Sequence, residues 1–139
     1  YTSLCFFEGT NVSVGRGTEK QFQIYGSPHL PKKGFNFIPV PNFGSKDPLH
    51  NGIKCYGEDL SQINPVNGIE LKWLLKAYES TGKKEQFFNS FFTNLAGSKN
   101  LQNQIVKGFT EDQIKATWVD GIEEFQKTRK KYLIYSDKK

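Results

Sequence analysis

The sequence predicts an α+β fold, in which a small mixed sheet from the N-terminal half is packed by about three helices from the C-terminal half. Short aromatic and β-branched segments, punctuated by glycine and proline, fill roughly the first 60 residues. After residue 66 the apolar residues recur at helical spacing instead. A length of 139 residues fits one domain, residues 1–139.

Short strands are expected in the first half of the chain. They are predicted at residues 4–7, 22–25, 35–41 and 53–56. Pro39 and Pro41 cannot donate to a ladder, so they restrict the third of these to a sheet edge or a strand end. Residues 132–135 are rich in β-formers and favour a last strand over a continuation of the preceding helix.

Helices are expected near 68–81, 99–107 and 111–130. Each has a start signal: Asn67 for the first, Ser98 for the second, and for the third a capping box from Thr110 to Gln113. Gly82 and Gly108 suit the positions just past the first two helices. The four phenylalanines of residues 87–92 form an aromatic cluster that we expect to be buried.

The third helix carries an apolar stripe. Its members are Ile114, Trp118, Ile122 and Phe125. We expect this stripe to face the core, with Trp118 as its anchor.

The chain carries a net charge of +5, and its basic residues gather near the end of the sequence. They are Lys127, Arg129, Lys130, Lys131, Lys138 and Lys139. Basic residues in the last turns of a helix complement its dipole. This explanation is favoured over nucleic-acid binding, because a nucleic-acid surface would need the basic residues interleaved with exposed aromatics along one face. No apolar run is long enough for a transmembrane helix. Because the chain lacks methionine, we expect it to be a piece of a longer protein.

Two cysteines, Cys5 and Cys55, leave two interpretations open. They pair in an oxidising compartment, or they are buried apolar thiols on neighbouring strands. No histidine or acidic residue stands at metal-ligand spacing from either, so neither a metal nor a cofactor is expected.

The richest segment for chemistry is residues 8–18, Glu-Gly-Thr-Asn-Val-Ser-Val-Gly-Arg-Gly-Thr. It gathers a carboxylate, a carboxamide, three hydroxyls and a guanidinium among three glycines, directly after an apolar segment. A binding loop at the end of a buried strand is favoured over a tight polar turn with Glu8 and Arg16 as a surface pair.

Other candidate chemistry is weaker. The glycines of Gly15-Arg16-Gly17 match neither the dinucleotide-binding fingerprint nor the Walker loop. His29 and His50 have no serine or cysteine partner that the sequence identifies, so a nucleophilic triad has no support. His50 with Asp47 and Asn51 is more typical of a solvated loop than of a polar cluster. Glu58 and Asp59 would face Glu8 if their strands were neighbours, and two carboxylates across a cleft would permit glycoside hydrolysis.

Residues 4–18, followed by Phe22 and Gly26-Ser-Pro28, resemble the motif of the bacterial exo-β-N-acetylmuramidases, long catalogued as a domain of unknown function. The segment 91–97 and the ending from Trp118 to Leu133 are also similar to that family, so the resemblance covers essentially the whole chain. Two positions depart from the family pattern. Gln21 stands where the family usually has proline, and His29 stands where it usually has an aromatic residue. Both lie beside the motif, so the departures affect the shape of the loop's far end and any stacking of a sugar on position 29.

The resemblance implies that this chain is the C-terminal domain of a two-domain glycosidase whose Rossmann-like N-terminal domain is absent. Members release N-acetylmuramic acid from the non-reducing ends of peptidoglycan fragments, in a cleft between the two domains. The implied partners are that N-terminal domain and peptidoglycan-derived sugars, and the implied location is the bacterial cell envelope, periplasmic or secreted. The chain alone would then be nearly inactive. The alternative is a non-catalytic peptidoglycan-binding or interaction module.

The implied roles fall on the polar segment. Arg16 would pair with the lactyl carboxylate of muramic acid, because its planar fork matches a carboxylate. The sugar-binding set would be Thr10, Asn11, Ser13, Arg16 and Thr18. Glu8 would bind a hydroxyl or assist a catalytic acid/base residue of the missing domain.

Overall fold

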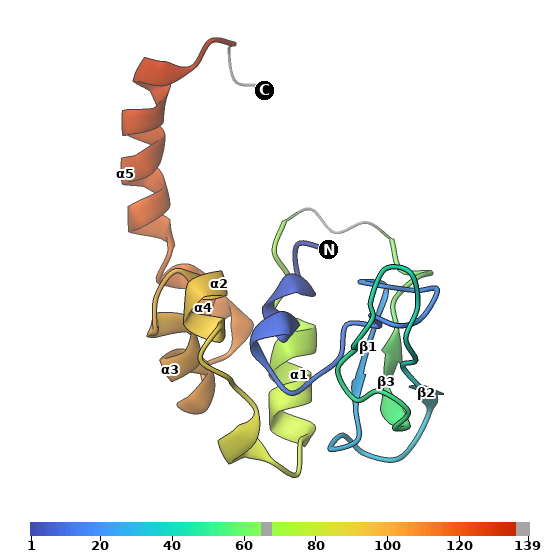
Figure 1. Ribbon diagram of the computed structural model, residues 1–139. Coiled ribbons are helices and arrows are strands. Elements are labelled where there is room, and N and C mark those ends of the chain that lie inside the picture. The colour runs from blue at the N-terminus through green and yellow to red at the C-terminus, as the bar shows by residue number, and fades with distance from the viewer. Residues whose placement is uncertain (65–67, 136–139) are drawn as a thin grey trace.

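The computed structural model describes residues 1–64 and 68–135. Strands lie in its first half and α-helices in its second (Figure 1), which confirms the predicted α+β class. The predicted helix start at Asn67 lies outside the described residues.

Three strands form the sheet in the order β1-β3-β2. They are β1 (Ile24–Ser27), β2 (Phe35–Phe37) and β3 (Cys55–Asp59). Both pairings are antiparallel, so the expectation of a mixed sheet is corrected. The reason lies in the connections, because a parallel pair needs a crossover, usually a helix, and the links between these strands contain none.

Glycines let other segments approach the middle of the sheet closely. Gly26 and Gly57 lie opposite each other on β1 and β3. A Cβ at Gly26 would meet the ring of Phe37 and the backbone of Tyr56, so a larger residue does not fit. Gly26 also exchanges two backbone hydrogen bonds with Ser13, which fastens the polar segment to β1.

The expected strand at residues 4–7 is wrong. Residues 5–7 belong to a 3₁₀ helix, η1 (Cys5–Gly9), whose N-cap is Leu4 and in which Phe6 and Phe7 are buried. A short apolar run has no period that separates a buried strand from a buried helical turn, which explains the error.

The described residues of the second half contain five α-helices. They are α1 (Lys72–Ser80), α2 (Phe92–Ala96), α3 (Asn100–Val106), α4 (Glu111–Ala116) and α5 (Val119–Arg129). Two further 3₁₀ turns are η2 (Lys84–Gln86) and η3 (Lys130–Tyr132). The capping box of Thr110 and Gln113 is confirmed at the start of α4.

The single helix expected over 111–130 is divided in two. The Thr117 hydroxyl donates to the carbonyl of Ile114 at 2.7 Å, and the amides of Thr117 and Trp118 bond three residues back. A threonine that bonds its own helix backbone in this way competes with the regular ladder. The strand expected at 132–135 is also wrong, because Tyr132 ends the 3₁₀ turn η3 and residues 133–135 form no strand.

Stacked and clustered aromatic side chains fill part of the core. Phe7 stacks on Tyr25 with ring centroids 4.9 Å apart, and Phe87 and Phe92 are fully buried beside them. The expected burial of the aromatic cluster holds for these two but not for Phe91, which is 49% exposed.

Both cysteines are free thiols, Cys5 half-buried in η1 and Cys55 buried in β3. Burial raises the pKa of the Cys55 thiol to about 12. No helix among the described residues is long and apolar enough to span a membrane.

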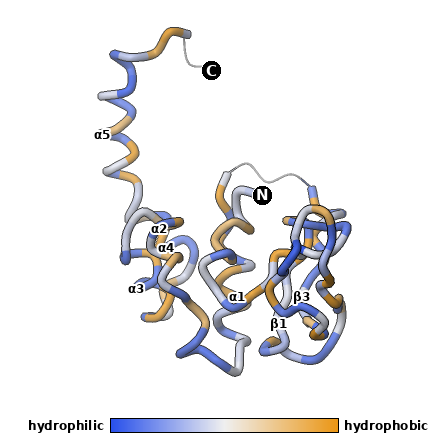
Figure 2. The backbone as a smooth tube through the Cα atoms, in the orientation of Figure 1, coloured by the Kyte–Doolittle hydropathy of each residue, from blue (hydrophilic) through white to orange (hydrophobic). Residues whose placement is uncertain are grey.

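The apolar stripe of the last helices is mostly uncovered. Ile114 is buried and Trp118 packs at the edge of the core, but Ile122 and Phe125 on α5 are exposed. Figure 1 shows α5 extending away from the rest of the domain, and Figure 2 shows hydrophobic residues recurring along it. The expectation that the whole stripe faces the core is therefore wrong, because among the described residues α5 meets the rest of the domain only at its base.

Candidate functional site

The polar segment of residues 8–18, called the motif segment below, joins the two halves of the fold. Thr10 bridges to Phe88 and Ser13 to Gly26. The amide of Asn11 donates to the carbonyl of Phe87 at 2.8 Å. Backbone bonds therefore hold the segment to the helical half on one side and to β1 on the other.

The three hydroxyls of the motif segment bond to the backbone of the segment itself or of Phe7, which directly precedes it. Thr10 Oγ1 donates to the Phe7 carbonyl at 2.8 Å and accepts the amide of Val12. Ser13 Oγ accepts the amide of Gly15, and Thr18 Oγ1 donates to the Gly15 carbonyl at 2.7 Å. Thr10 and Ser13 are buried, so their hydroxyls shape the loop from inside it.

Glu8 and Arg16 form an ion pair across the motif segment. Glu8 Oε1 accepts from Arg16 Nη2 at 2.7 Å and from Nε at 3.1 Å. The guanidinium also lies 5.0 Å from the centroid of the Phe22 ring, which holds it from a second side. The Arg16 side chain is still 46% exposed, so a ligand can reach it.

Two glycines make the turn between these groups. Gly15 and Gly17 both have a positive φ, at 77° and 80°. A Cβ on Gly17 would meet Pro48 and the carbonyl of Val40, so only glycine fits where the loop of residues 38–54 crosses the motif segment.

His50 fastens that crossing loop to the motif segment. Its Nε2 lies 2.8 Å from the carbonyl oxygen of Asn11, and since a carbonyl only accepts, Nε2 carries a proton here. His50 holds a left-handed φ of 63°, and its ring meets His29 edge-on. Burial lowers the pKa of His50. The sequence indicated a solvated loop, and no spacing in it connects His50 with Asn11.

The side-chain amide of Asn11 is enclosed. Both its oxygen and its nitrogen are buried, and neither has a hydrogen-bond partner among the described residues. A buried amide without a protein partner is satisfied by ordered water or by a ligand group. Among the predicted sugar-binding residues, Asn11 and Arg16 thus retain polar groups that the motif segment does not use internally.

A pocket of about 240 Å³ lies against the motif segment. Glu8, Thr10 and Arg16 line it, together with Leu49 from the crossing loop and Asn89. Known ligand pockets are generally larger, roughly 300–1,000 Å³, so this one has the size of part of a site. Asn89 was missed by sequence reasoning, since nothing but its polarity marks it within an aromatic segment.

The carboxylates of β3 are engaged elsewhere. Glu58 accepts from the hydroxyl of Tyr25 at 2.8 Å and pairs with Lys76 at 2.6 Å. Both carboxylates of β3 line a separate pocket against α1, of which Glu8 is not a part. The idea that they face Glu8 across a cleft therefore finds no support in the described residues.

Asp59 is also paired. Its hydrogen bond from Lys20 at 2.6 Å, assisted by Ser61, lowers its pKa to about 2. A carboxyl group with so low a pKa stays ionised near neutral pH and does not serve as a proton donor there. No group of three or more histidine, cysteine or acidic residues placed to hold a metal ion occurs in residues 1–64 or 68–135.

Known proteins are similar to this chain over nearly its whole length, including the motif segment. The family model described as "Exo-beta-N-acetylmuramidase NamZ, C-terminal" matches residues 1–135. The peptidoglycan β-N-acetylmuramidase NamZ of Bacillus subtilis is 29% identical over 152 aligned positions, which cover 97% of this chain and 36% of that protein. A crystal structure of a DUF1343 family protein from Bacteroides fragilis superposes with a TM-score of 0.92 at 38% identity, covering 98% of this chain and 40% of that one.

Proposed function

Because the chain belongs to the family of NamZ C-terminal domains, we propose that it forms one wall of the substrate cleft of an exo-β-N-acetylmuramidase. The enzyme would release N-acetylmuramic acid from the non-reducing ends of peptidoglycan fragments in the bacterial cell envelope. The chain spans about two-fifths or less of its relatives. The other wall, with the catalytic acid and base, would come from a Rossmann-like domain upstream.

The observation that carries this proposal is the pocket beside the Glu8–Arg16 pair. Its lining combines polar side chains, such as those of Glu8, Arg16 and Asn89, with apolar ones, and its size fits part of a sugar ring with its substituents. A surface of this kind becomes a full site when a second domain closes over it.

Arg16 is the residue proposed to recognise muramic acid. Glu8 engages Nε and Nη2, and no described hydrogen bond uses Nη1. The exposed side of the guanidinium would therefore receive the lactyl carboxylate, the group that distinguishes muramic acid from glucosamine. Asn89, which lines the pocket, is proposed to bond a hydroxyl or acetamido group there, and the enclosed Asn11 amide is proposed to act through an ordered water.

Glu8 is proposed as a positioning residue. One of its oxygens holds the guanidinium of Arg16, and Phe22 supports that group from another side. The second oxygen would accept a bond from a sugar hydroxyl or from an acid/base residue of the upstream domain. For Thr10, Ser13 and Thr18 the backbone bonds support a role in shaping the loop, with sugar contact secondary.

One observation favours a second function, that of a non-catalytic sugar-binding module. Glu8, Glu58 and Asp59 each pair with a basic residue, so the described acidic residues near either pocket form no facing acid/base pair. A domain of this kind binds its sugar without cleaving it.

Two assays separate the functions. The full-length polypeptide is incubated with peptidoglycan fragments, and free N-acetylmuramic acid is measured; the 139-residue chain is titrated with N-acetylmuramic acid and with chitobiose. We expect release by the full-length protein, none by the chain, and a preference for muramic acid. Binding without release by the full-length protein would support the module, and neither binding nor release would contradict both.

A further inference from the structure

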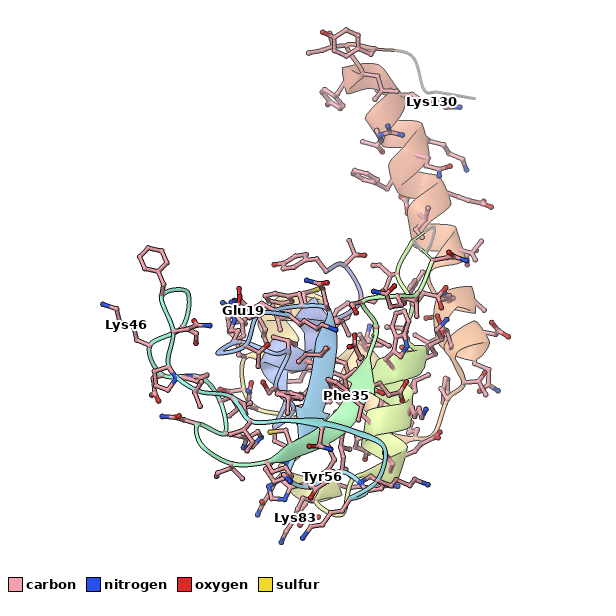
Figure 3. All side chains as sticks on the ribbon, turned by 90° about the vertical axis from the view of Figure 1, so that its right-hand side faces the viewer. Glu19, Phe35, Lys46, Tyr56, Lys83 and Lys130 are labelled. Atoms are coloured by element: carbon pink, nitrogen blue, oxygen red, sulfur yellow. The ribbon has the colours of Figure 1, made fainter. Side chains whose placement is uncertain are left out.

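Helix α5 has an apolar side with nothing packed against it. None of its residues is buried, and Ile122 and Phe125 are 49% and 64% exposed. The helix points away from the domain in two perpendicular views, with Lys130 near its far end in Figure 3. An isolated helix of this length is marginal in water, because most helical stability in proteins comes from packing one face.

The apolar side of α5 continues into a groove on the domain. Trp118, Ile122 and Phe125 fall within a narrow arc, because they are spaced four and then three residues apart. A groove of about 460 Å³ at the base of α5 is lined by Trp118 and Ile122 together with Phe6, Ile69 and Leu95. The helix and the groove thus form one continuous surface, the α5 surface, defined by Phe6, Ile69, Leu95, Trp118, Ile122 and Phe125.

The relatives indicate what could cover this surface. The chain corresponds to 36% of the length of one relative and 40% of another, and the matching family model describes a C-terminal domain. Sequence upstream would therefore join at Tyr1. The N-terminus lies on the side of the domain from which α5 projects (Figure 1), so an upstream domain begins within reach of the helix.

Charge adds to the description of the partner. The C-cap of α5 and the turn after it contain Lys130 and Lys131, whereas Asp120 and Glu124 lie in the first half of the helix. A complementary surface would be apolar in the middle and acidic where it meets the far end of the helix.

We propose that the α5 surface is the docking site for the upstream domain of the same polypeptide, which presents an apolar ridge with an acidic patch at one end. This inference rests on the two-domain arrangement of the proposed function but not on its sugar specificity. The exposed stripe then becomes an interdomain core. Docking along α5 fixes the angle between the domains, and with it the shape of the cleft beside the motif segment.

The test compares two double variants of the full-length polypeptide. Ile122→Gln with Phe125→Gln removes apolar groups from the α5 surface. Glu123→Gln with Lys127→Gln changes the opposite face of the same helix, and glutamine is a good helix former in both. Hydrogen exchange of the α5 amides is measured by mass spectrometry in the two variants and in the wild type.

We expect slow exchange along α5 in the wild type and in the opposite-face variant, and exchange faster by about tenfold or more in the α5-surface variant. Fast exchange in the wild type, or equal effects of the two variants, would overturn the proposal. Light scattering provides a second readout: a dimer that the α5-surface variant converts to a monomer would assign the surface to a second copy instead. A protected α5 in a protein that releases no N-acetylmuramic acid would contradict the proposed function alone.

Discussion

The motif segment and α5 differ in a way that their sequences do not suggest. Residues 8–18 are rich in polar groups and glycine, yet most of them are buried or half-buried. α5 carries an apolar stripe, yet no residue of it is buried. Polarity alone therefore does not decide burial; the neighbours that a segment has on each side do.

The cause lies in the backbone. The motif segment exchanges hydrogen bonds with β1 on one side and with the Phe87–Asn89 segment on the other, which leaves its small side chains enclosed. α5 satisfies its backbone internally and, among the described residues, packs against the domain only at its base. The motif segment is held by the fold on both sides, whereas the apolar side of α5 is open to a partner.

The largest expected effect comes from removing a ring beside the motif segment. Phe7 is fully buried and stacks on Tyr25, so Phe7→Ala should lower the free energy of unfolding by ~3–5 kcal/mol. Phe125→Ala on α5 should change it by less than about 0.5 kcal/mol in the 139-residue chain. Denaturant unfolding measures both. Similar losses in the two variants would mean that α5 packs on its own domain.

Glycine substitutions sharpen the same comparison. Gly17→Ala places a Cβ against Pro48 at a φ of 80° and should destabilise the chain by about 1–3 kcal/mol. Gly121→Ala, inside α5 with open space around it, should stabilise that helix by about 0.5–1 kcal/mol. Thermal unfolding followed by circular dichroism reports both changes. A stable Gly17→Ala variant would show that the crossing loop moves aside freely.

A smaller effect concerns pH and the crossing loop. Burial lowers the pKa of His50 below its ordinary value of 6.5, so the unfolded chain binds a proton more readily than the folded one. The free energy of unfolding should therefore fall as the pH drops from about 6.5 toward the lowered pKa of the folded state. Above pH 6.5 the contribution of His50 should stay constant. His50→Asn, which tolerates the left-handed backbone, should flatten this dependence. Identical pH profiles of unfolding for the two proteins would rule out His50 as the source.

Much of the fold was predictable, because it rests on local signals. The helix start at Thr110 follows from the capping box that Thr110 forms with Gln113. Gly108, after α3, has the positive φ that is typical of a helix end. The strands at 22–25 and 53–56 were found with shifted ends, since pairing partners rather than propensity set where a strand stops.

The misses share a different cause. Whether residues 4–7 turn or extend, and whether Ile122 faces a core, depends on elements distant in sequence or outside the chain. The candidate site divides in the same way. The motif segment is visible in the sequence, but its ion pair, its enclosed amide and the contributions of Leu49, His50 and Asn89 come from loops folded back onto it.

The motif segment is proposed to supply half of a muramic acid site, with Arg16 as the anion contact. The most direct test is Arg16→Lys in the full-length polypeptide, because lysine keeps the charge but loses the planar fork. Activity is compared on a muramic acid substrate and on the glucosamine analogue that lacks the lactyl group.

The preference for muramic acid should fall by roughly ten- to a hundredfold, the size of one charge-assisted hydrogen bond of ~1.5–3 kcal/mol. Equal losses on the two substrates would contradict the claim and make Arg16 a structural partner of Glu8. No loss on either would leave the motif segment a polar turn.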